Sequence, residues 1–100
     1  MIINVKVSQK YIDNGKRKDC HICPVALAIK DIVKPRYRDQ IEISNYSIQI
    51  NPMNYDYIML PYRVSNIIIK YDKSGVMKPF KFILDIPSDL EYFFRDDLDG

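Results

Sequence analysis

The stretch Lys-Pro-Phe-Lys-Phe-Ile-Leu-Asp-Ile at residues 78–86 decides the fold class. Large apolar side chains recur in it at every second position, and these are Phe80, Phe82, Leu84 and Ile86. The side chains between them would face the opposite way, and these are Lys81, Ile83 and Asp85. Such alternation is typical of a β-strand with one buried face.

The sequence predicts four more strands, at Ile2–Ser8, Gln40–Ser44, Tyr46–Asn51 and Asp56–Leu60. Each alternates between apolar and polar residues, as a half-buried strand does. Asn45 lies between the second and third of these strands and suits a tight turn or a bulge. A loop would follow at residues 51–54, where asparagine and proline cluster.

Helix signals separate these strands. Ser8 would cap a short helix, Gln9–Asn14, and Gly15 would end it in a left-handed conformation. Pro24 would begin a second helix that runs to about Val33, because proline suits the first helical position.

Two later segments also have helical features. In residues 61–71 the apolar side chains would share one helix face, but the three isoleucines at 67–69 also suit a buried strand. Both interpretations therefore stay open for this segment. Pro87 and Ser88 would begin a short C-terminal helix, Asp89–Asp96, with Leu90, Phe93 and Phe94 turned inward.

Mixed helices and strands, most of them able to pair as hairpins, indicate the α+β class. We expect a small single domain with a mainly antiparallel sheet of four to five strands and two to four short helices packed on it. Residues 1–96 would form this domain, and the acidic end at 97–100 would fray.

Composition predicts a cytoplasmic protein without a membrane partner. No apolar run in the 100 residues approaches the ~20 needed to cross a bilayer. Residues 1–10 alternate and contain no apolar core of a signal peptide. Two cysteines are too few for a disulfide scaffold, so we expect reduced thiols.

The net charge of +2 is unevenly spread. Residues 1–84 contain 14 Lys and Arg against 7 Asp and Glu, whereas residues 85–100 contain 1 Arg against 6 Asp and Glu. The acidic tail would be a solvated end, or it would limit non-specific adhesion of a basic body that attracts an anion.

Cys20-His21-Ile22-Cys23-Pro24 is the most unusual motif, and it has three interpretations. As a zinc site, Cys20, His21 and Cys23 would need a further ligand, because the chain has no other Cys or His. As a redox site, Cys23 at a helix N-terminus would be stabilised as thiolate. As structural residues, the two cysteines would be small buried hydrophobes that tie the loop to the core. We expect no cofactor.

A basic set supplies candidate anion-binding residues, namely Arg17, Lys18, Arg36, Arg38 and Arg63, with Tyr37 and Tyr46 as stacking faces. If the loop at 16–19 met the C-terminal end of the second helix, these residues would suit a nucleotide phosphate or a nucleic acid. The same charges would otherwise be a solvated face or complement the helix end.

Tyrosines interleaved with methionines form a second candidate binding set, Tyr55, Tyr57, Tyr62 and Tyr71 with Met53 and Met59. Tyrosine and methionine are enriched at protein interfaces because they offer contact area without a charge. Partial core packing with hydroxyl groups in water is the alternative.

Catalytic motifs are missing. The sequence has a single histidine, no Gly-x-Ser-x-Gly turn and no phosphate-binding glycine loop. We therefore expect a protein that is not an enzyme.

Two groups of motifs resemble a family of small, mostly uncharacterised proteins of tailed bacteriophages. The first is VSQKYIDNG at 7–15 with CHICPVALA at 20–28, and the second is Leu60-Pro61, Tyr71-Asp72 and Gly75 with KPFKFIL at 78–84. The resemblance implies an accessory protein made in an infected bacterium, and it favours a helix at 61–70. It assigns no catalytic residue.

Three functions follow from these observations. The first is a non-enzymatic phage counter-defence inhibitor that binds a host bacterial protein. The second is an oligomeric protein that sequesters a nucleotide signal, and the third is a zinc or redox module that depends on the cysteines.

Overall fold

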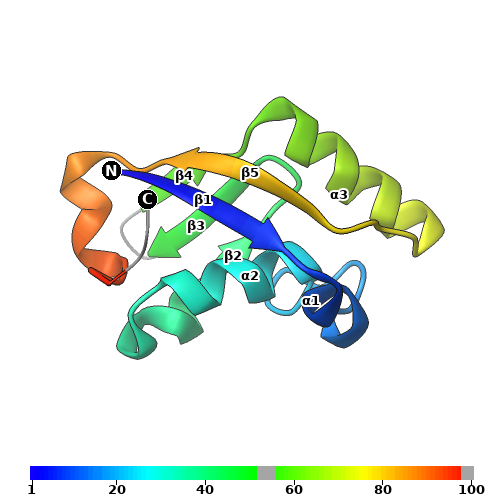
Figure 1. Ribbon diagram of the computed structural model, residues 1–100, viewed down its shortest axis with the longest axis horizontal. Helices are drawn as coiled ribbons and strands as arrows, with labels where there is room; N and C mark the ends of the chain where they lie inside the picture. Colours follow the sequence, from blue (N-terminus) through cyan, green and yellow to red (C-terminus); the bar gives the residue numbers. More distant parts are fainter. Residues whose placement is uncertain (52–55, 98–100) are drawn as a thin grey trace.

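The computed structural model describes residues 1–51 and 56–97 and confirms an α+β domain of helices and antiparallel strands (Figure 1). The strands of this described part form two sheets. A two-stranded ribbon pairs β1 with β5, at Ile2–Val7 and Phe80–Asp85. A three-stranded sheet has the order β2-β3-β4, at Glu42–Ile43, Ser47–Asn51 and Asp56–Met59.

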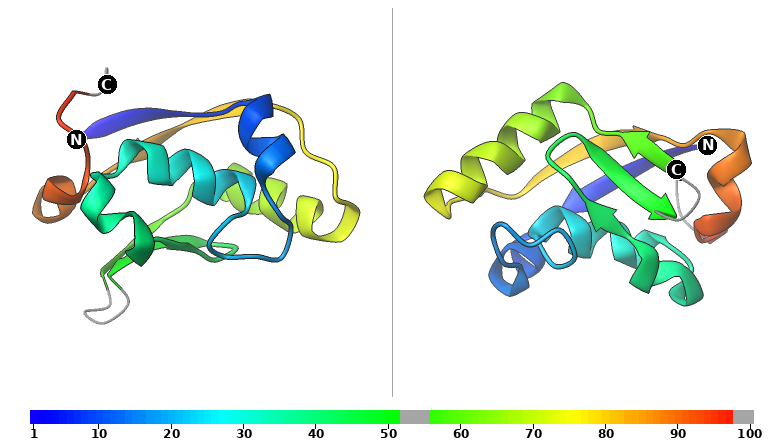
Figure 2. Two further views of the ribbon diagram at one scale, coloured as in Figure 1. Left: turned by 90° about the horizontal axis from the view of Figure 1, so that it is seen from below. Right: turned by 180° about the vertical axis from the view of Figure 1, so that it is seen from behind.

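The ribbon and the three-stranded sheet form two layers with the core between them (Figure 2). Helix α2, Pro24–Ile32, lies along one side of the gap between the layers, and α3, Tyr62–Ser74, lies along the other. No described helix covers the outer face of either layer (Figure 2). Antiparallel sheets tolerate one solvated face, and exposed side chains lie on the outer face of both layers.

Alternation in the sequence decides which side chains fill the core. The ribbon contributes Ile3, Val5, Val7, Phe82 and Leu84, all nearly fully buried. The opposite sheet contributes Ile43, Ile48, Ile50 and Ile58, and the helices contribute Val25, Ile29, Val64, Ile68 and Tyr71. The predicted strands at both ends of the chain are therefore confirmed, with the predicted inward faces.

The segment at 61–71 is helical from Tyr62 onward, with Pro61 as the N-cap of α3, so the helix interpretation is confirmed. Its apolar positions recur at helical spacing, with Val64, Ile68 and Tyr71 buried.

Gly75 ends α3 with a φ of 73°, a left-handed conformation in which a residue with Cβ is strained.

The expected left-handed turn at Gly15 is wrong. Helix α1, Gln9–Asn14, has the expected bounds, but Ser8 precedes it without a capping hydrogen bond from its side chain. Gly15 has a φ of −82°, which any residue adopts. Glycine is needed there for space, because a Cβ at this position would lie 2.7 Å from Cδ of Pro24. The first turn of α2 thus packs directly on the end of α1.

Two 3₁₀ segments differ from expectation. η1, Pro35–Gln40, takes up the start of the strand predicted at 40–44, and so β2 is only two residues long. The predicted C-terminal α-helix is instead η3, Ser88–Phe93, a 3₁₀ helix. It ends early because Phe94 forms a β-bridge with Val33, beyond the end of α2.

Among the described residues, no helix combines the length and the apolar character that a membrane crossing requires.

Candidate functional site

The cysteine motif lies in a compact loop that links α1 to α2. The backbone N–H of Lys16 donates to the carbonyl of Ile22 over 2.9 Å and closes the loop on itself. Lys18 has a φ of 60°, and its N–H donates to Oδ1 of Asp72 on α3 over 2.9 Å. Asp19 accepts from the N–H of His21 over 3.0 Å, which shapes the turn. The loop is thus closed on itself and hydrogen-bonded to α3.

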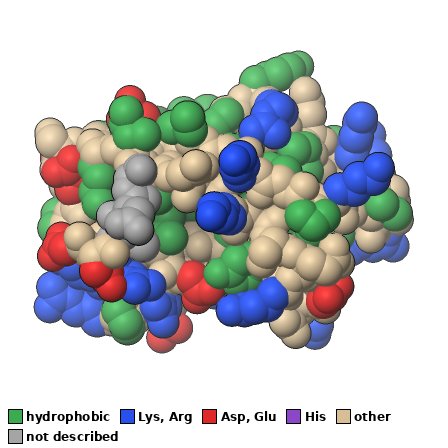
Figure 3. All heavy atoms as spheres, in the orientation of Figure 1, with side chains coloured by type: hydrophobic (Ala, Val, Ile, Leu, Met, Phe, Trp, Pro, Cys, Tyr) green, Lys and Arg blue, Asp and Glu red, His purple; other side chains and the backbone are tan. Residues whose placement is uncertain are grey.

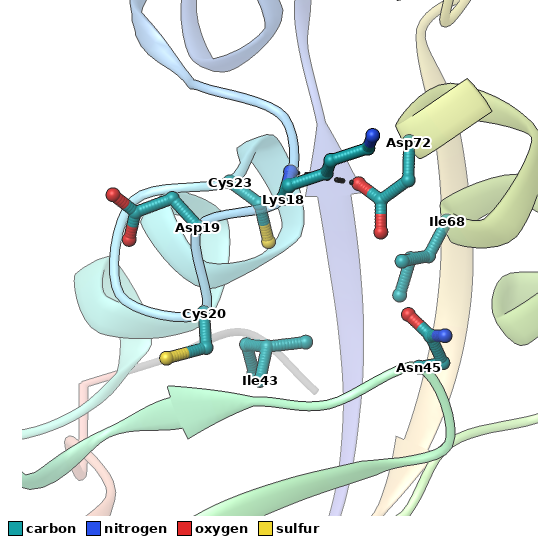
Figure 4. Close-up of a pocket in the computed structure, with 8 residues that line it drawn as sticks. All are labelled: Lys18, Asp19, Cys20, Cys23, Ile43, Asn45, Ile68 and Asp72. Carbon is teal, nitrogen blue, oxygen red and sulfur yellow. Dashed lines mark hydrogen bonds between the residues drawn. The ribbon is translucent and has the colours of Figure 1, made fainter. Parts of the chain in front are cut away.

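A small cavity of about 170 Å³ lies under this loop (Figure 4). Its lining combines loop, sheet and α3 residues, namely Lys18, Asp19, Cys20, Cys23, Ile43, Asn45, Ile68 and Asp72. Figure 4 shows the sulfur of Cys23 turned toward the cavity and that of Cys20 turned away from it. The cavity is smaller than typical ligand pockets, which begin at roughly 300 Å³.

Cys23 is buried at the N-terminus of α2, where it is the N-cap residue. It is 6% exposed, and its Sγ accepts from the N–H of Ala26 over 3.4 Å. Burial raises the pKa of this thiol to about 11, against a smaller lowering by the backbone N–H groups of Ala26 and Val25. Desolvation thus outweighs the helix terminus, and the thiolate that redox chemistry needs is disfavoured.

Cys20 differs from the prediction that both cysteines are buried. It is exposed, because the loop turns its side chain outward, and both thiols are free. Nε2 of His21 lies 3.5 Å from Oε1 of Glu42. In the described part of the chain, no three His, Cys, Asp or Glu side chains are grouped as a metal site requires.

The candidate anion-binding residues do not converge. Arg17 and Lys18 belong to the loop before α2, whereas Arg36, Tyr37 and Arg38 belong to η1 after it. Figure 1 shows the loop and η1 at opposite ends of α2. The condition for a shared phosphate site is therefore not met.

The residues of η1 have structural contacts. Nε of Arg38 donates to the carbonyl of Lys30 over 2.7 Å, which caps the C-terminus of α2. The ring of Tyr37 packs edge-on against Phe93, with 4.7 Å between centroids. The guanidinium of Arg36 lies 4.8 Å from the Tyr37 ring centroid. These contacts support the alternative that the cluster complements the helix end.

Two other predicted residues lie where the chain leaves β4. Tyr62 is the first residue of α3 and is 79% exposed. Arg63 follows it, and its Nη2 donates to the carbonyl of Lys81 on β5 over 2.7 Å. The side chain of Arg63 is therefore held beside the ribbon.

The outer face of the three-stranded sheet exposes a tyrosine and a methionine. Tyr57 and Met59 lie two residues apart on β4, 56% and 61% exposed, while Ile58 between them is buried. Tyr46 is also exposed, but its carbonyl accepts from the N–H of Leu60, which is buried, so alternation along the strands does not place it on the face of Tyr57 and Met59. We call Tyr57 and Met59 the tyrosine–methionine surface.

The rest of the predicted tyrosine set is not part of this surface. Tyr71 is buried in the core, where burial raises the pKa of its hydroxyl. Met53 and Tyr55 lie outside the described residues.

One group of exposed cations could not be predicted from the sequence. Lys6 and Lys81 lie directly opposite each other on the outer face of the β1–β5 ribbon. The alternation of each strand placed both side chains outward, but only the strand register shows that they are neighbours.

Comparisons with models of protein families, with curated proteins and with solved structures gave no match. The resemblance to phage proteins therefore stays a prediction.

Proposed function

We propose that this protein acts by binding another protein through the tyrosine–methionine surface, without catalysis. The observation that carries the proposal is the pair Tyr57 and Met59, more than half exposed on a sheet face that no described helix covers. Large uncharged side chains on a regular, rigid surface are typical of interface centres.

The position of this pair supports docking. On the neighbouring strand β3, the residues opposite Met59 and Tyr57 are Ser47 and Gln49. Gln49 in turn lies opposite Glu42 on β2. Tyr57 and Met59 thus form a largely apolar centre with polar residues on one side. In protein interfaces such a polar rim excludes water from the central residues, which contribute most of the binding energy.

The other two functions have less support. Nucleotide binding would need the arginines to converge, and they lie at opposite ends of α2. A thiol or zinc module would need Cys20 and Cys23 to act together, but one is exposed and the other is buried with a raised pKa.

The biological setting of the proposal comes from the resemblance to phage proteins. We take the partner to be a protein of an infected bacterium, met in the cytoplasm, and the outcome of binding to be inhibition of a host defence.

Photo-crosslinking followed by calorimetry tests the proposal. A photoreactive phenylalanine analogue replaces Tyr57, and in a matched control it replaces Val76, which is 67% exposed just beyond α3. We expect one host protein to crosslink from position 57 and not from position 76. With that protein purified, Tyr57→Ser and Met59→Ser should each weaken binding by about 10-fold or more, as truncation of a central interface residue does.

Val76→Ser is the matched control and should bind as the wild type does. Equal affinity of all three variants would contradict the proposal. A crosslink to a second copy of this chain alone would make the surface an oligomer interface and would overturn the host-partner assignment.

A further inference from the structure

The outer face of the β1–β5 ribbon is a separate surface, on the opposite side of the molecule from the tyrosine–methionine surface (Figure 2). Its cross-strand pairs are Ile2 with Asp85, Asn4 with Ile83, and Lys6 with Lys81. All six side chains are exposed. Figure 3 views this face and shows Lys and Arg side chains gathered over its middle.

The pairing geometry brings the two lysines close together. Met1 and Ile86 exchange both backbone hydrogen bonds, over 2.7 and 3.1 Å. Hydrogen-bonded and non-hydrogen-bonded pairs alternate along an antiparallel ladder, and so Lys6 and Lys81 form a non-hydrogen-bonded pair. Their Cβ atoms are therefore about 4.5–5.5 Å apart, a distance at which like charges destabilise a sheet.

No ion pair of the described part includes these lysines, and Asp85, the acidic residue on the same face, lies four residues along β5 from Lys81. The ion pairs there join Met1 to Glu91, His21 to Glu42 and Arg95 to Asp97, and none involves the ribbon lysines. The hydrogen bond to the Lys81 carbonyl holds Arg63 beside the same edge. Lys6, Lys81 and Arg63 thus lie around one end of the ribbon face, and none of them forms an ion pair with a described residue.

Two shallow grooves of about 400 Å³ each flank these cations and share Lys81. One is lined by Asn4, Pro61, Arg63, Lys81, Phe82 and Ile83, and the other by Lys6, Val7, Ser8, Pro79, Phe80 and Lys81. Neither lining contains Asp or Glu. Together the grooves make a track that alternates cations with neutral amide and apolar groups.

We propose that this track binds single-stranded nucleic acid. A phosphate backbone supplies the negative charges that Lys6, Lys81 and Arg63 lack, and counterion release would drive the association. The Asn4 amide can pair with base edges, and the exposed Ile83 offers apolar contact to sugars and bases. The Phe80 ring is occupied, with Phe82 stacked 6.0 Å away and Arg63 6.0 Å from its centroid. We therefore expect phosphate contacts, which do not depend on sequence, to supply most of the affinity.

Fluorescence anisotropy with labelled oligo-dT and oligo-U tests this inference. Three phosphate contacts predict a log–log salt slope of about −2, because each contributes about −0.7 for a single strand. Affinity should then decrease roughly 20-fold between about 50 and 200 mM salt. The double variant Lys6→Gln, Lys81→Gln should bind at least 10-fold more weakly at the lower salt concentration.

The matched control is Lys70→Gln, Lys73→Gln, which removes the same charge from exposed positions of α3. It should bind as the wild type does. Removal of a like-charge pair does not destabilise the sheet, so urea unfolding of the ribbon variant should match or exceed that of the wild type. This measurement separates lost binding from lost folding.

Three results would overturn the inference. They are absence of oligonucleotide binding at low salt, equal losses in the two double variants, and displacement of the oligonucleotide by polyglutamate at the same charge concentration. The last result would assign the track to an acidic protein. None of them affects the tyrosine–methionine surface, which lies on the other layer.

Discussion

Cys23 should be far less reactive than Cys20 toward iodoacetamide, although only two residues separate them. The alkylating agent reacts with thiolate. Burial raises the pKa of Cys23 from 9.0 to about 11, so near neutral pH its thiolate fraction decreases about 100-fold. Its 6% exposure slows the reaction further, whereas Cys20 is exposed. We therefore expect a rate ratio of at least about 100.

Intact-mass spectrometry of a time course measures this ratio directly. The Cys20→Ser variant reports Cys23 alone, and the Cys23→Ser variant reports Cys20 alone. In denaturant the two rates should become similar, because the difference arises from burial in the folded protein.

Rates within about tenfold of each other in the folded state would contradict the burial and raised pKa of Cys23. That result would place Cys23 in contact with solvent as a thiolate, as a redox site requires. The redox interpretation of the motif would then regain its support.

Three further predictions concern stability. Gly15→Ala should lower the free energy of unfolding by about 1–3 kcal/mol, because the added Cβ would overlap Pro24. An unchanged midpoint of urea unfolding would show that the structure accommodates the Cβ without loss of stability. Arg38→Met should lower the free energy of unfolding by about 0.5–1.5 kcal/mol and the melting temperature by several degrees, because the hydrogen bond that caps α2 is lost. An unchanged melting temperature in calorimetry would show that this hydrogen bond does not stabilise the fold. Below pH 9 the Cys23 thiol is protonated in both the folded and the unfolded state, and its contribution to stability is fully present; this contribution should decrease by up to about 2 kcal/mol between pH 9 and 11. Cys23→Ala should therefore lose less stability than the wild type at alkaline pH. An identical dependence of stability on pH in the two proteins would contradict the raised pKa.

Local patterns in the sequence were sufficient for most of the secondary structure. The alternation at 78–86 and at 2–8 predicted both ribbon strands and their buried faces, because each strand solvates its outer face. Pro24 and the apolar spacing behind it predicted α2 to within a residue. These features depend on neighbouring residues only.

Features that depend on distant contacts could not be predicted in this way. The division of the strands into two sheets depends on how the layers enclose the core. The need for a glycine at position 15 depends on the position of Pro24, which leaves no space for a Cβ. The separation of Arg17 from Arg38 depends on which ends of α2 the two segments occupy. The pairing of Lys6 with Lys81 requires the register of strands 75 residues apart.

Methyl NMR of Met59 tests the proposed docking surface most directly. Met59 is 61% exposed on the outer face of β4, whereas Met77 is 9% exposed and serves as an internal control in the same spectrum. When the crosslinked partner is added to protein labelled at its methionine methyl groups, we expect the Met59 signal to shift or broaden and the Met77 signal to stay unchanged. An unchanged Met59 signal, at partner concentrations that calorimetry shows to be saturating, would contradict the proposed docking surface.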